Sequence, residues 1–308
     1  MAAVIAYLAA DDLVDQLIEE LTLAGVSISA SHGNLLIAEG PPVRAAWAIN
    51  VWHDAEEFAI SSIGDAARIL RGVQRNWSCY APILGGRSRL IAEKLPHVST
   101  RPLVVGGSAP HAPLGAWTLL APDRLLAAGR CDSPFPNGVP NLLEDRLGPP
   151  SRAYLKLWEA FARHGRAPRP GELCVDLGAS PGGWTWLAAS YGARVIAIDK
   201  APLAAAVNAM SGVEWRAGSA FALEPTSFGT VDWMVCDVIA YPRRTLALVK
   251  RWIAAGNTRN IVCTIKFQGE TDHAVVDEFA ALPGAWVGHL HHNKHELTFA
   301  VIEPRRPD

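Results

Sequence analysis

The sequence predicts an α/β protein in which a mainly parallel sheet, with helices on both faces, follows an N-terminal domain of mixed helices and strands. At 308 residues the chain exceeds the usual size of one hydrophobic core, which predicts two domains. Half of the residues are hydrophobic and 19% are charged, as in folded globular proteins and unlike disordered ones. From residue 151 onward, strand-like apolar runs alternate with helical patterns, and this alternation is typical of a parallel sheet.

Charge and cysteine content narrow the class of protein. The formal net charge of −2 argues against a protein that coats nucleic acid through bulk charge, although a local basic patch stays open. The five cysteines form no C-x-x-C pair, which predicts reduced cytosolic thiols rather than disulfides or a zinc site. The apolar start MAAVIAYLAADD has no basic residues, which indicates a first strand rather than a signal peptide. No apolar run approaches the roughly 18 residues of a membrane span. We therefore expect a cytoplasmic protein without a membrane partner or a bound metal.

Residues 1–103 are predicted to form the N-terminal α+β domain. The pattern predicts a strand over 4–9, a helix capped by Asp11, a hairpin turning at His32-Gly33-Asn34, and helices over 63–77 and 87–94. Residues 104–150 are predicted to be a linker that carries one hairpin, over 116–120 and 124–128. Residues 104–113 are rich in glycine, proline and alanine, and residues 133–150 hold five prolines, which indicates an extended connector.

Residues 151–308 are predicted to form the second domain. Its predicted helices cover residues 152–164, 182–191, 204–210, 243–255 and 271–282. Its predicted strands cover residues 173–178, 194–199, 213–216, 231–238 and 260–266, with a final hairpin over 285–291 and 296–302.

Four of these apolar strands end in a charged residue, namely Asp176, Asp199, Asp237 and Lys266. An open parallel sheet binds ligands outside the carboxyl ends of its strands, so the four charges are predicted to share one crevice. Each of them alone is equally well explained as a solvated strand end or a helix cap. Their recurrence on four strands favours a site.

The loop after the first of these strands, Asp-Leu-Gly-Ala-Ser-Pro-Gly-Gly-Trp over residues 176–184, is rich in glycine. Gly178 allows a tight turn, and Gly182 and Gly183 let the backbone approach a ligand before the next helix. The loop is not G-x-G-x-x-G, and Pro181 has no N–H to donate, which disfavours a dinucleotide pyrophosphate.

Asp199 ends the second strand, where a carboxylate suits the hydroxyls of a ribose. The glycine loop and this acid together predict a ligand that contains a nucleoside. Trp184 is expected to border it.

This loop resembles the S-adenosylmethionine loop of the FtsJ-like ribose 2′-O-methyltransferases, and the preceding Pro-Ser-Arg-Ala-Tyr-Leu-Lys-Leu is similar to that family's leading helix. The resemblance covers roughly residues 150–302. It implies a Rossmann-like class I methyltransferase domain with a C-terminal antiparallel hairpin strand, and S-adenosyl-L-methionine as the cofactor. The residues it implies for cofactor binding are Asp176, Gly178, Ser180, Pro181, Gly182, Gly183, Trp184, Asp199, Ser219 and Asp237. Ser219 stands where the family usually has an acid for the adenine, so Ser219 or backbone is expected to take that role.

The family also uses a Lys-Asp-Lys-Glu tetrad. Matching segments occur in the same order here, and they imply the catalytic residues Lys156, Asp237, Lys266 and Glu296. We hypothesise that Lys266 is the general base for the ribose 2′-hydroxyl, favoured in its neutral form by partial burial and by the second cation, Lys156. For Lys156, helical spacing alone favours another interpretation, a solvated surface pair with Glu159.

The N-terminal half looks most like the RlmM-type branch, which acts on large-subunit ribosomal RNA and carries a THUMP-like RNA-binding domain. The features are the mixed domain, the hairpin near residue 120 and the Ser-Pro-Phe-Pro-Asn-Gly connector. The implied partner is RNA, most specifically large-subunit (23S) ribosomal RNA, with no obligate protein partner evident. The alternative is a non-catalytic RNA-binding or ribosome-assembly factor that retained the fold.

Other features are weaker candidates for RNA contact. The first candidates are Arg152 and Arg163 on one face of the predicted helix over 152–164, with Arg166 and Arg169 just after it. The others are Arg243 and Arg244, at the start of the predicted helix over 243–255. One or two exposed tryptophans of the 11 are expected to stack bases. The histidines near Glu296 are a less favoured zinc candidate, because no cysteine is nearby in sequence.

Overall fold

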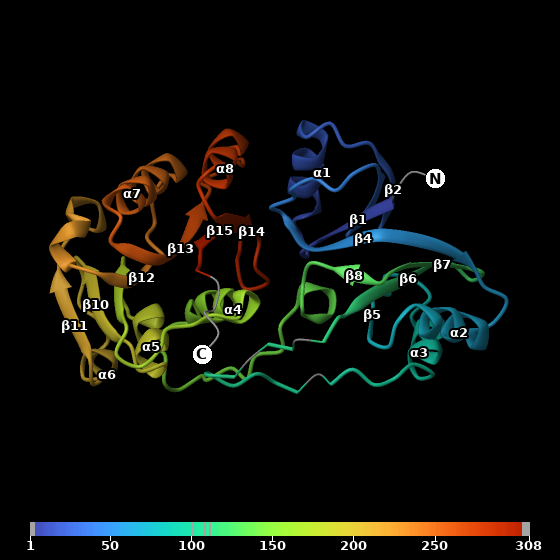
Figure 1. The fold of residues 1–308 in the computed structure, drawn as a ribbon, viewed down its shortest axis with the longest axis horizontal. Helices are drawn as coiled ribbons and strands as arrows, with labels where there is room; N and C mark the ends of the chain where they lie inside the picture. The colour runs from blue at the N-terminus through green and yellow to red at the C-terminus, as the bar shows by residue number, and fades with distance from the viewer. Residues whose placement is uncertain (1–3, 100, 108, 111, 304–308) are drawn as a thin grey trace. The chain divides into compact units, whose positions relative to one another are not determined.

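The computed structural model describes residues 4–99, 101–107, 109–110 and 112–303. The chain forms two compact units, each with its own sheet (Figure 1). The N-terminal unit comprises Met1–Pro102 with Ala109–Asn141, and the C-terminal unit comprises Leu103–Ser108 with Leu142–Asp308.

The N-terminal unit contains one eight-stranded sheet and three α-helices. The strands are β1 (Val4–Ala9), β2 (Ile28–His32), β3 (Leu35–Glu39), β4 (Ala48–Ala59), β5 (Trp77–Cys79), β6 (Gly115–Ala121), β7 (Arg124–Ala128) and β8 (Arg130–Cys131). The helices are α1 (Val14–Leu23), α2 (Ile63–Val73) and α3 (Gly85–Ala92). The strand order is β2-β3-β1-β4-β7-β6-β5, with β8 also paired to β4. Leu70 of α2 and Ile91 of α3 are fully buried in a cluster with Trp117 of β6.

The boundary between the units differs from the predicted linker over 104–150. The hairpin β6–β7 belongs to the N-terminal sheet, because β7 pairs with the second half of β4 over Glu56–Ala59. Strand β4 is missing from the sequence prediction, because its apolar alternation is broken by Asn50, His53 and Asp54, and Asp54 has a φ of 51°. The register between β1 and β4 also shifts, which indicates a bulge. This long strand joins segments that sequence pattern alone assigns to different parts of the chain.

The C-terminal unit alternates strands and helices as predicted. The strands are β9 (Leu173–Leu177), β10 (Arg194–Asp199), β11 (Val213–Ala217), β12 (Val231–Cys236), β13 (Thr258–Lys266), β14 (Ala285–Gly288) and β15 (Glu296–Val301). The helices are α4 (Tyr154–His164), α5 (Gly183–Ser190), α6 (Ala205–Asn208), α7 (Pro242–Ala255) and α8 (His273–Ala280).

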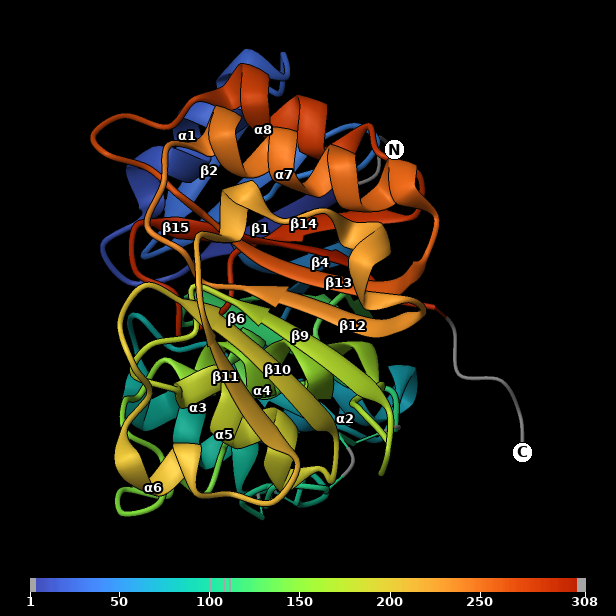
Figure 2. The ribbon, with the colours of Figure 1, turned by 90° about the vertical axis from the view of Figure 1, so that its left-hand side faces the viewer.

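The seven strands form one sheet in the order β11-β10-β9-β12-β13-β15-β14. Strands β9 to β13 are parallel, and β15 runs antiparallel between β13 and β14. Figures 1 and 2 show α4 and α5 on one face of this sheet and α7 and α8 on the other. The predicted Rossmann-like sheet with its antiparallel hairpin strand is confirmed. The chain reverses its direction of travel across the sheet between β9 and β12, and ligands bind at such a switch point.

The tryptophans lie mainly in the two cores. All 11 fall within the described residues; eight are buried and none is exposed. In the C-terminal core, Phe161 packs edge-on against Trp233 with ring centroids 5.0 Å apart. The expectation that an exposed tryptophan stacks RNA bases is therefore wrong for this chain.

No helix in the described part of the chain combines the length and apolar character needed to cross a bilayer.

Candidate active site

A pocket of ≈ 510 Å³ lies at the carboxyl ends of the central strands of the C-terminal sheet. Asp176, Asp199, Asp237 and Lys266 all line it. The predicted convergence of the four strand-end charges is confirmed, because β9, β10, β12 and β13 are parallel and end at the same edge. The wall also contains Gly178, Ser180, Pro181, Gly183 and Trp184 of the glycine-rich loop, together with Ser151, Ala153, Ala179, Val238 and Ile239.

The glycines of this loop are required by close contacts and by backbone conformation. Gly178 has a φ of 76°, and a Cβ there would lie 2.9 Å from Cβ of Val238. Gly182 has a φ of 112°, and a Cβ there would lie 3.0 Å from Cγ1 of Val207. Both values of φ are ones that side chains strongly disfavour. Gly178 and Gly183 line the pocket, whereas Gly182, predicted to approach the cofactor, lies outside the lining and packs against Val207.

Asp176 is buried at the base of the pocket, with an exposed fraction of 1%. Its Oδ2 accepts a hydrogen bond of 2.6 Å from Thr185 Oγ1, whereas its Oδ1 is buried without a partner among the described residues. Burial raises the pKa of Asp176 to about 7, and the hydrogen bond from Thr185 offsets this only in part. Asp176 lines the pocket, and a buried carboxylate oxygen without a donor is a hydrogen bond left unmade.

Asp199 is oriented by its own backbone surroundings. Its Oδ2 accepts from Ser180 N at 3.1 Å and its Oδ1 from Ala201 N at 2.9 Å, so the carboxylate sits fixed at the pocket wall. Ser219 follows β11 and lies outside the pocket lining; its Oγ accepts from Phe221 N at 3.4 Å. The predicted adenine contact of Ser219 remains a prediction.

Beside the pocket, Lys156 of α4 joins two acids that are distant in sequence. Its Nζ lies 2.9 Å from each carboxylate oxygen of Asp237 and 3.0 Å from Oε1 of Glu296. Only 11% of its side chain is exposed. Burial acts to lower the pKa of Lys156, but the two carboxylates outweigh it and the pKa is raised above its ordinary value. Lys156 is therefore a buried cation, and the surface pair with Glu159 is wrong.

Lys266 approaches the same acid from the last residue of β13. Its Nζ lies 2.8 Å from Oδ1 of Asp237 and donates to the Asp237 carbonyl oxygen at 2.9 Å. Thr264 Oγ1 also donates to Oδ1 of Asp237, at 2.8 Å. Lys266 and Glu296 are opposite each other in the pairing of β13 with β15. The four residues of the predicted tetrad thus meet around Asp237, and Lys266 is the amine that lines the pocket.

Glu159 is a supporting residue whose role the sequence did not reveal. It is fully buried one turn after Lys156, and it accepts hydrogen bonds from the backbone N–H of His291 and His292 and from Nδ1 of His292. These bonds offset the burial and hold the pKa of Glu159 below its ordinary value. One face of α4 thereby fixes both Glu296 and the loop that leads to it. The available signal was a single acid within a helix whose other residues are mainly apolar, from Tyr154 to Ala162.

The basic helix face expected to contact RNA is largely occupied by ion pairs. Arg163 is only 10% exposed at its side chain and lies 3.5 Å from Oε1 of Glu159. Arg166 is 14% exposed and lies 2.8 Å from Oε1 of Glu172. These two arginines fix α4 rather than present charge to RNA, so the expectation is wrong for them.

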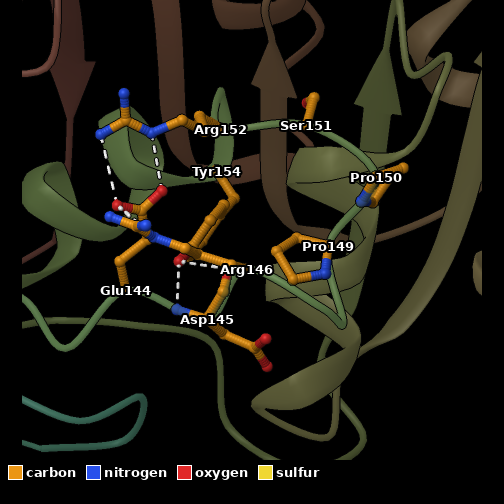
Figure 3. Close-up of a pocket in the computed structure, with 8 residues that line it drawn as sticks. All are labelled: Glu144, Asp145, Arg146, Pro149, Pro150, Ser151, Arg152 and Tyr154. Atoms are coloured by element: carbon orange, nitrogen blue, oxygen red, sulfur yellow. Dashed lines mark hydrogen bonds and ion pairs between the residues drawn. The ribbon is translucent and has the colours of Figure 1, made fainter.

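A second pocket of ≈ 540 Å³ lies in the segment that leads into α4 and shares Ser151 with the first (Figure 3). Figure 3 shows the Arg152 guanidinium facing the Glu144 carboxylate, at 2.6 Å from Nε to Oε1. Tyr154 Oη accepts from the N–H of Asp145 at 2.8 Å. These contacts anchor the segment to the first turn of α4, and so help to position Lys156.

The histidines near Glu296 have separate partners. Burial lowers the pKa of His289 to about 4, and its Nε2 lies 3.0 Å from the Lys294 carbonyl oxygen. His292 is hydrogen-bonded to Glu159 through Nδ1, and the ring centroids of His295 and Phe267 lie 5.8 Å apart. Among the described residues, no three His, Cys, Asp or Glu side chains are arranged to hold a metal ion.

Comparison with known proteins finds a family likeness in the part of the chain that holds this site. Residues 149–281 match the model of the FtsJ-like methyltransferases. This part of the chain is therefore similar to an FtsJ-like methyltransferase domain. It contains the pocket, the glycine loop and three of the four tetrad residues, and β15 supplies Glu296.

Curated relatives extend the likeness. The chain is 38% identical over 172 residues to "Ribosomal RNA large subunit methyltransferase M" of Halorhodospira halophila. This match covers 53% of this chain and 50% of that protein. It is 42% identical over 150 residues to the protein of the same name from Azoarcus sp., covering 46% of this chain and 40% of that one. The chain therefore aligns with about half the length of the curated relatives it matches. Among solved structures, the Methanococcus jannaschii fibrillarin pre-rRNA processing protein is 17% identical, with a TM-score of 0.40 over 61% of this chain and 82% of that one, a likeness too weak to argue from.

Proposed function

We propose that this protein transfers a methyl group from S-adenosyl-L-methionine to a ribose 2′-hydroxyl of RNA, with large-subunit ribosomal RNA as the substrate. The observation that carries the proposal is the meeting of Lys156, Asp237, Lys266 and Glu296 beside a nucleoside-sized pocket. The relatives named as large-subunit ribosomal RNA methyltransferases support the choice of RNA. The N-terminal unit is proposed as the THUMP-like RNA-binding part.

The pocket residues fit this cofactor. Gly178 and Gly183 line the pocket without side chains, and Asp199 offers a carboxylate for ribose hydroxyls. The unpartnered Oδ1 of Asp176 suits a charged amino group, as in the methionine part. When bound there, S-adenosylmethionine supplies a methyl group activated by a sulfonium.

The amines and acids have distinct roles in this proposal. Lys156 stays protonated between Asp237 and Glu296, because the two carboxylates raise its pKa. Lys266 would then accept the proton of the 2′-hydroxyl at Nζ. That oxygen would take up the methyl group of the bound cofactor, with the C–S bond breaking and the sulfur leaving as a neutral thioether. Asp237 orients Nζ of Lys266 through its carboxylate and its carbonyl oxygen. Fixed positions of the reacting groups supply much of the rate of such an in-line displacement.

The test is transfer of tritiated methyl groups to unmodified large-subunit ribosomal RNA. Wild-type protein is expected to incorporate label, and Lys266→Ala is expected to lose at least about 100-fold in kcat, the usual share of a general base. Lys250→Ala is the matched control, because Lys250 is an exposed lysine of the same unit that pairs with Glu278. Near-normal turnover of Lys266→Ala at saturating substrates would exclude the assigned base.

Binding of S-adenosylmethionine without transfer to any RNA would instead favour the non-catalytic RNA-binding or ribosome-assembly factor. Calorimetric titration of the cofactor, run in parallel with the transfer assay, separates the two functions.

A further inference from the structure

An exposed aromatic side chain follows two residues after a residue that lines the pocket. All 11 tryptophans, five tyrosines and eight phenylalanines fall within the described residues, and among them only Tyr241 is exposed, at 66%. Ile239, two residues earlier, is 80% exposed and lines the pocket. Large apolar side chains held in water beside a binding site usually mark a surface that a ligand covers.

The loop holds these two side chains outward. Ala240 and Pro242 are buried, so the side chains from Ile239 to Pro242 alternate between solvent and core. Pro242 begins α7, and the carbonyl oxygen of Tyr241 accepts from the N–H of Arg244. The extended backbone places Ile239 and Tyr241 about 7 Å apart, the scale of a single nucleotide. Because the loop is anchored, presenting the ring costs little ordering entropy on binding.

A positive charge accompanies the aromatic ring. The guanidinium of Arg244 lies 3.8 Å from the centroid of the Phe221 ring, and among the described residues it forms no ion pair with an acid. Arg243, by contrast, pairs with Asp272 and Glu278. Exposed aromatic rings next to cationic side chains are the combination by which proteins bind single-stranded nucleic acid.

We propose that Tyr241 and Ile239 form a stacking platform for a base of single-stranded RNA next to the reacting ribose, and that Arg244 contacts the adjoining phosphate. The inference rests on the proposed function, because the reacting 2′-hydroxyl must reach Lys266 in the pocket that Ile239 also lines. A base within a duplex has no free face for the ring. The platform therefore selects an unpaired nucleotide as the target and fixes its register.

The test is fluorescence anisotropy with a labelled uridine oligonucleotide of about 12 nucleotides, within the span of single-strand sites. Tyr241→Ala is expected to raise the Kd by about 5- to 150-fold, the usual effect of losing one stacked base. Tyr241→Phe keeps the ring and is expected to bind within about twofold of wild type. Leu143→Ala, which removes another exposed apolar side chain of the same unit, is the control and is expected to leave the Kd unchanged.

An oligonucleotide of the same length without bases supplies the second arm. It is expected to bind wild type and Tyr241→Ala equally, since it has nothing to stack. The proposed stacking platform is refuted if Tyr241→Ala binds the uridine oligonucleotide as tightly as wild type does. It is also refuted if wild type binds the two oligonucleotides with equal affinity. The anisotropy measurement does not depend on methyl transfer. If the wild-type protein transfers no methyl group but its RNA affinity still depends on Tyr241, the proposed function is refuted and the stacking platform is not.

Discussion

Asp176→Asn is expected to stabilise the free protein while weakening cofactor binding. The pKa of Asp176 is raised from 3.8 to about 7, mainly by burial. At about 1.36 kcal/mol per unit, this shift costs the folded state roughly 4 kcal/mol when the carboxylate is charged. Asparagine has the same shape but leaves a buried amide N–H unpaired, at about 1–3 kcal/mol. The net gain at pH 7.5 is therefore about 2 kcal/mol in the free energy of unfolding.

The pH dependence gives this prediction a second signature. An acid whose pKa is raised on folding binds a proton more readily in the folded state, so wild-type stability gains as the pH falls from about 7 toward 4. Between pH 7.5 and 5.5, protonation of Asp176 raises the free energy of unfolding of the wild type by about 2 kcal/mol, and Asp176→Asn lacks this gain. Urea unfolding of both proteins at the two pH values measures the difference, and other titrating groups cancel in the comparison.

Asp199→Asn is the matched control for Asp176→Asn. Both acids line the pocket, but each oxygen of Asp199 already accepts a backbone N–H, so its replacement is expected to give no stabilisation. Asp176→Asn is further expected to weaken S-adenosylmethionine binding about tenfold, the value of one charged hydrogen bond, by calorimetric titration. The reasoning fails if Asp176→Asn is less stable than wild type at pH 7.5, or if its stability advantage does not shrink at pH 5.5.

Three further substitutions test the supports of the site. Glu159→Gln is expected to lower the free energy of unfolding by about 2–4 kcal/mol in urea, because a buried charged acceptor of three hydrogen bonds is lost; an unchanged midpoint would contradict this. Lys156→Met is expected to lower it by about 3–5 kcal/mol and to abolish transfer, since two buried carboxylates lose their cation; normal transfer would contradict the tetrad. Gly182→Ala is expected to lower the free energy of unfolding by about 1–3 kcal/mol in urea, because its φ is 112° and Val207 leaves no room for a Cβ; an unchanged midpoint would contradict this.

The C-terminal unit was largely predictable from the sequence, because its strands are continuous apolar runs that end in charges. Parallel strands align their carboxyl ends, so reading Asp176, Asp199, Asp237 and Lys266 along the chain sufficed to bring them into one pocket. The partners of Lys156 were harder to predict from the sequence. Helical spacing places Glu159 next to Lys156 on the helix surface. Only the packing of α4 shows that both side chains are buried and that each contacts a different partner.

The N-terminal unit was less predictable, since β4 mixes polar and apolar residues and bends at Asp54. Its pairing with β7 joins residues that are 65 to 71 positions apart, and no local pattern encodes such a pairing. The number of tryptophans did not predict which aromatic side chain is exposed. Eleven tryptophans suggested that one of them is exposed, whereas among the described aromatic residues the exposed ring is Tyr241.

Alkaline hydrolysis of the RNA methylated by this protein tests the central claim most directly. A methyl group on the 2′-oxygen removes the nucleophile that cleaves the neighbouring phosphodiester, so the proposed reaction predicts tritium in alkali-resistant dinucleotides. The label must depend on Lys266 and survive in Lys250→Ala. Tritium recovered in mononucleotides would show base methylation and contradict the account, and so would full labelling by Lys266→Ala.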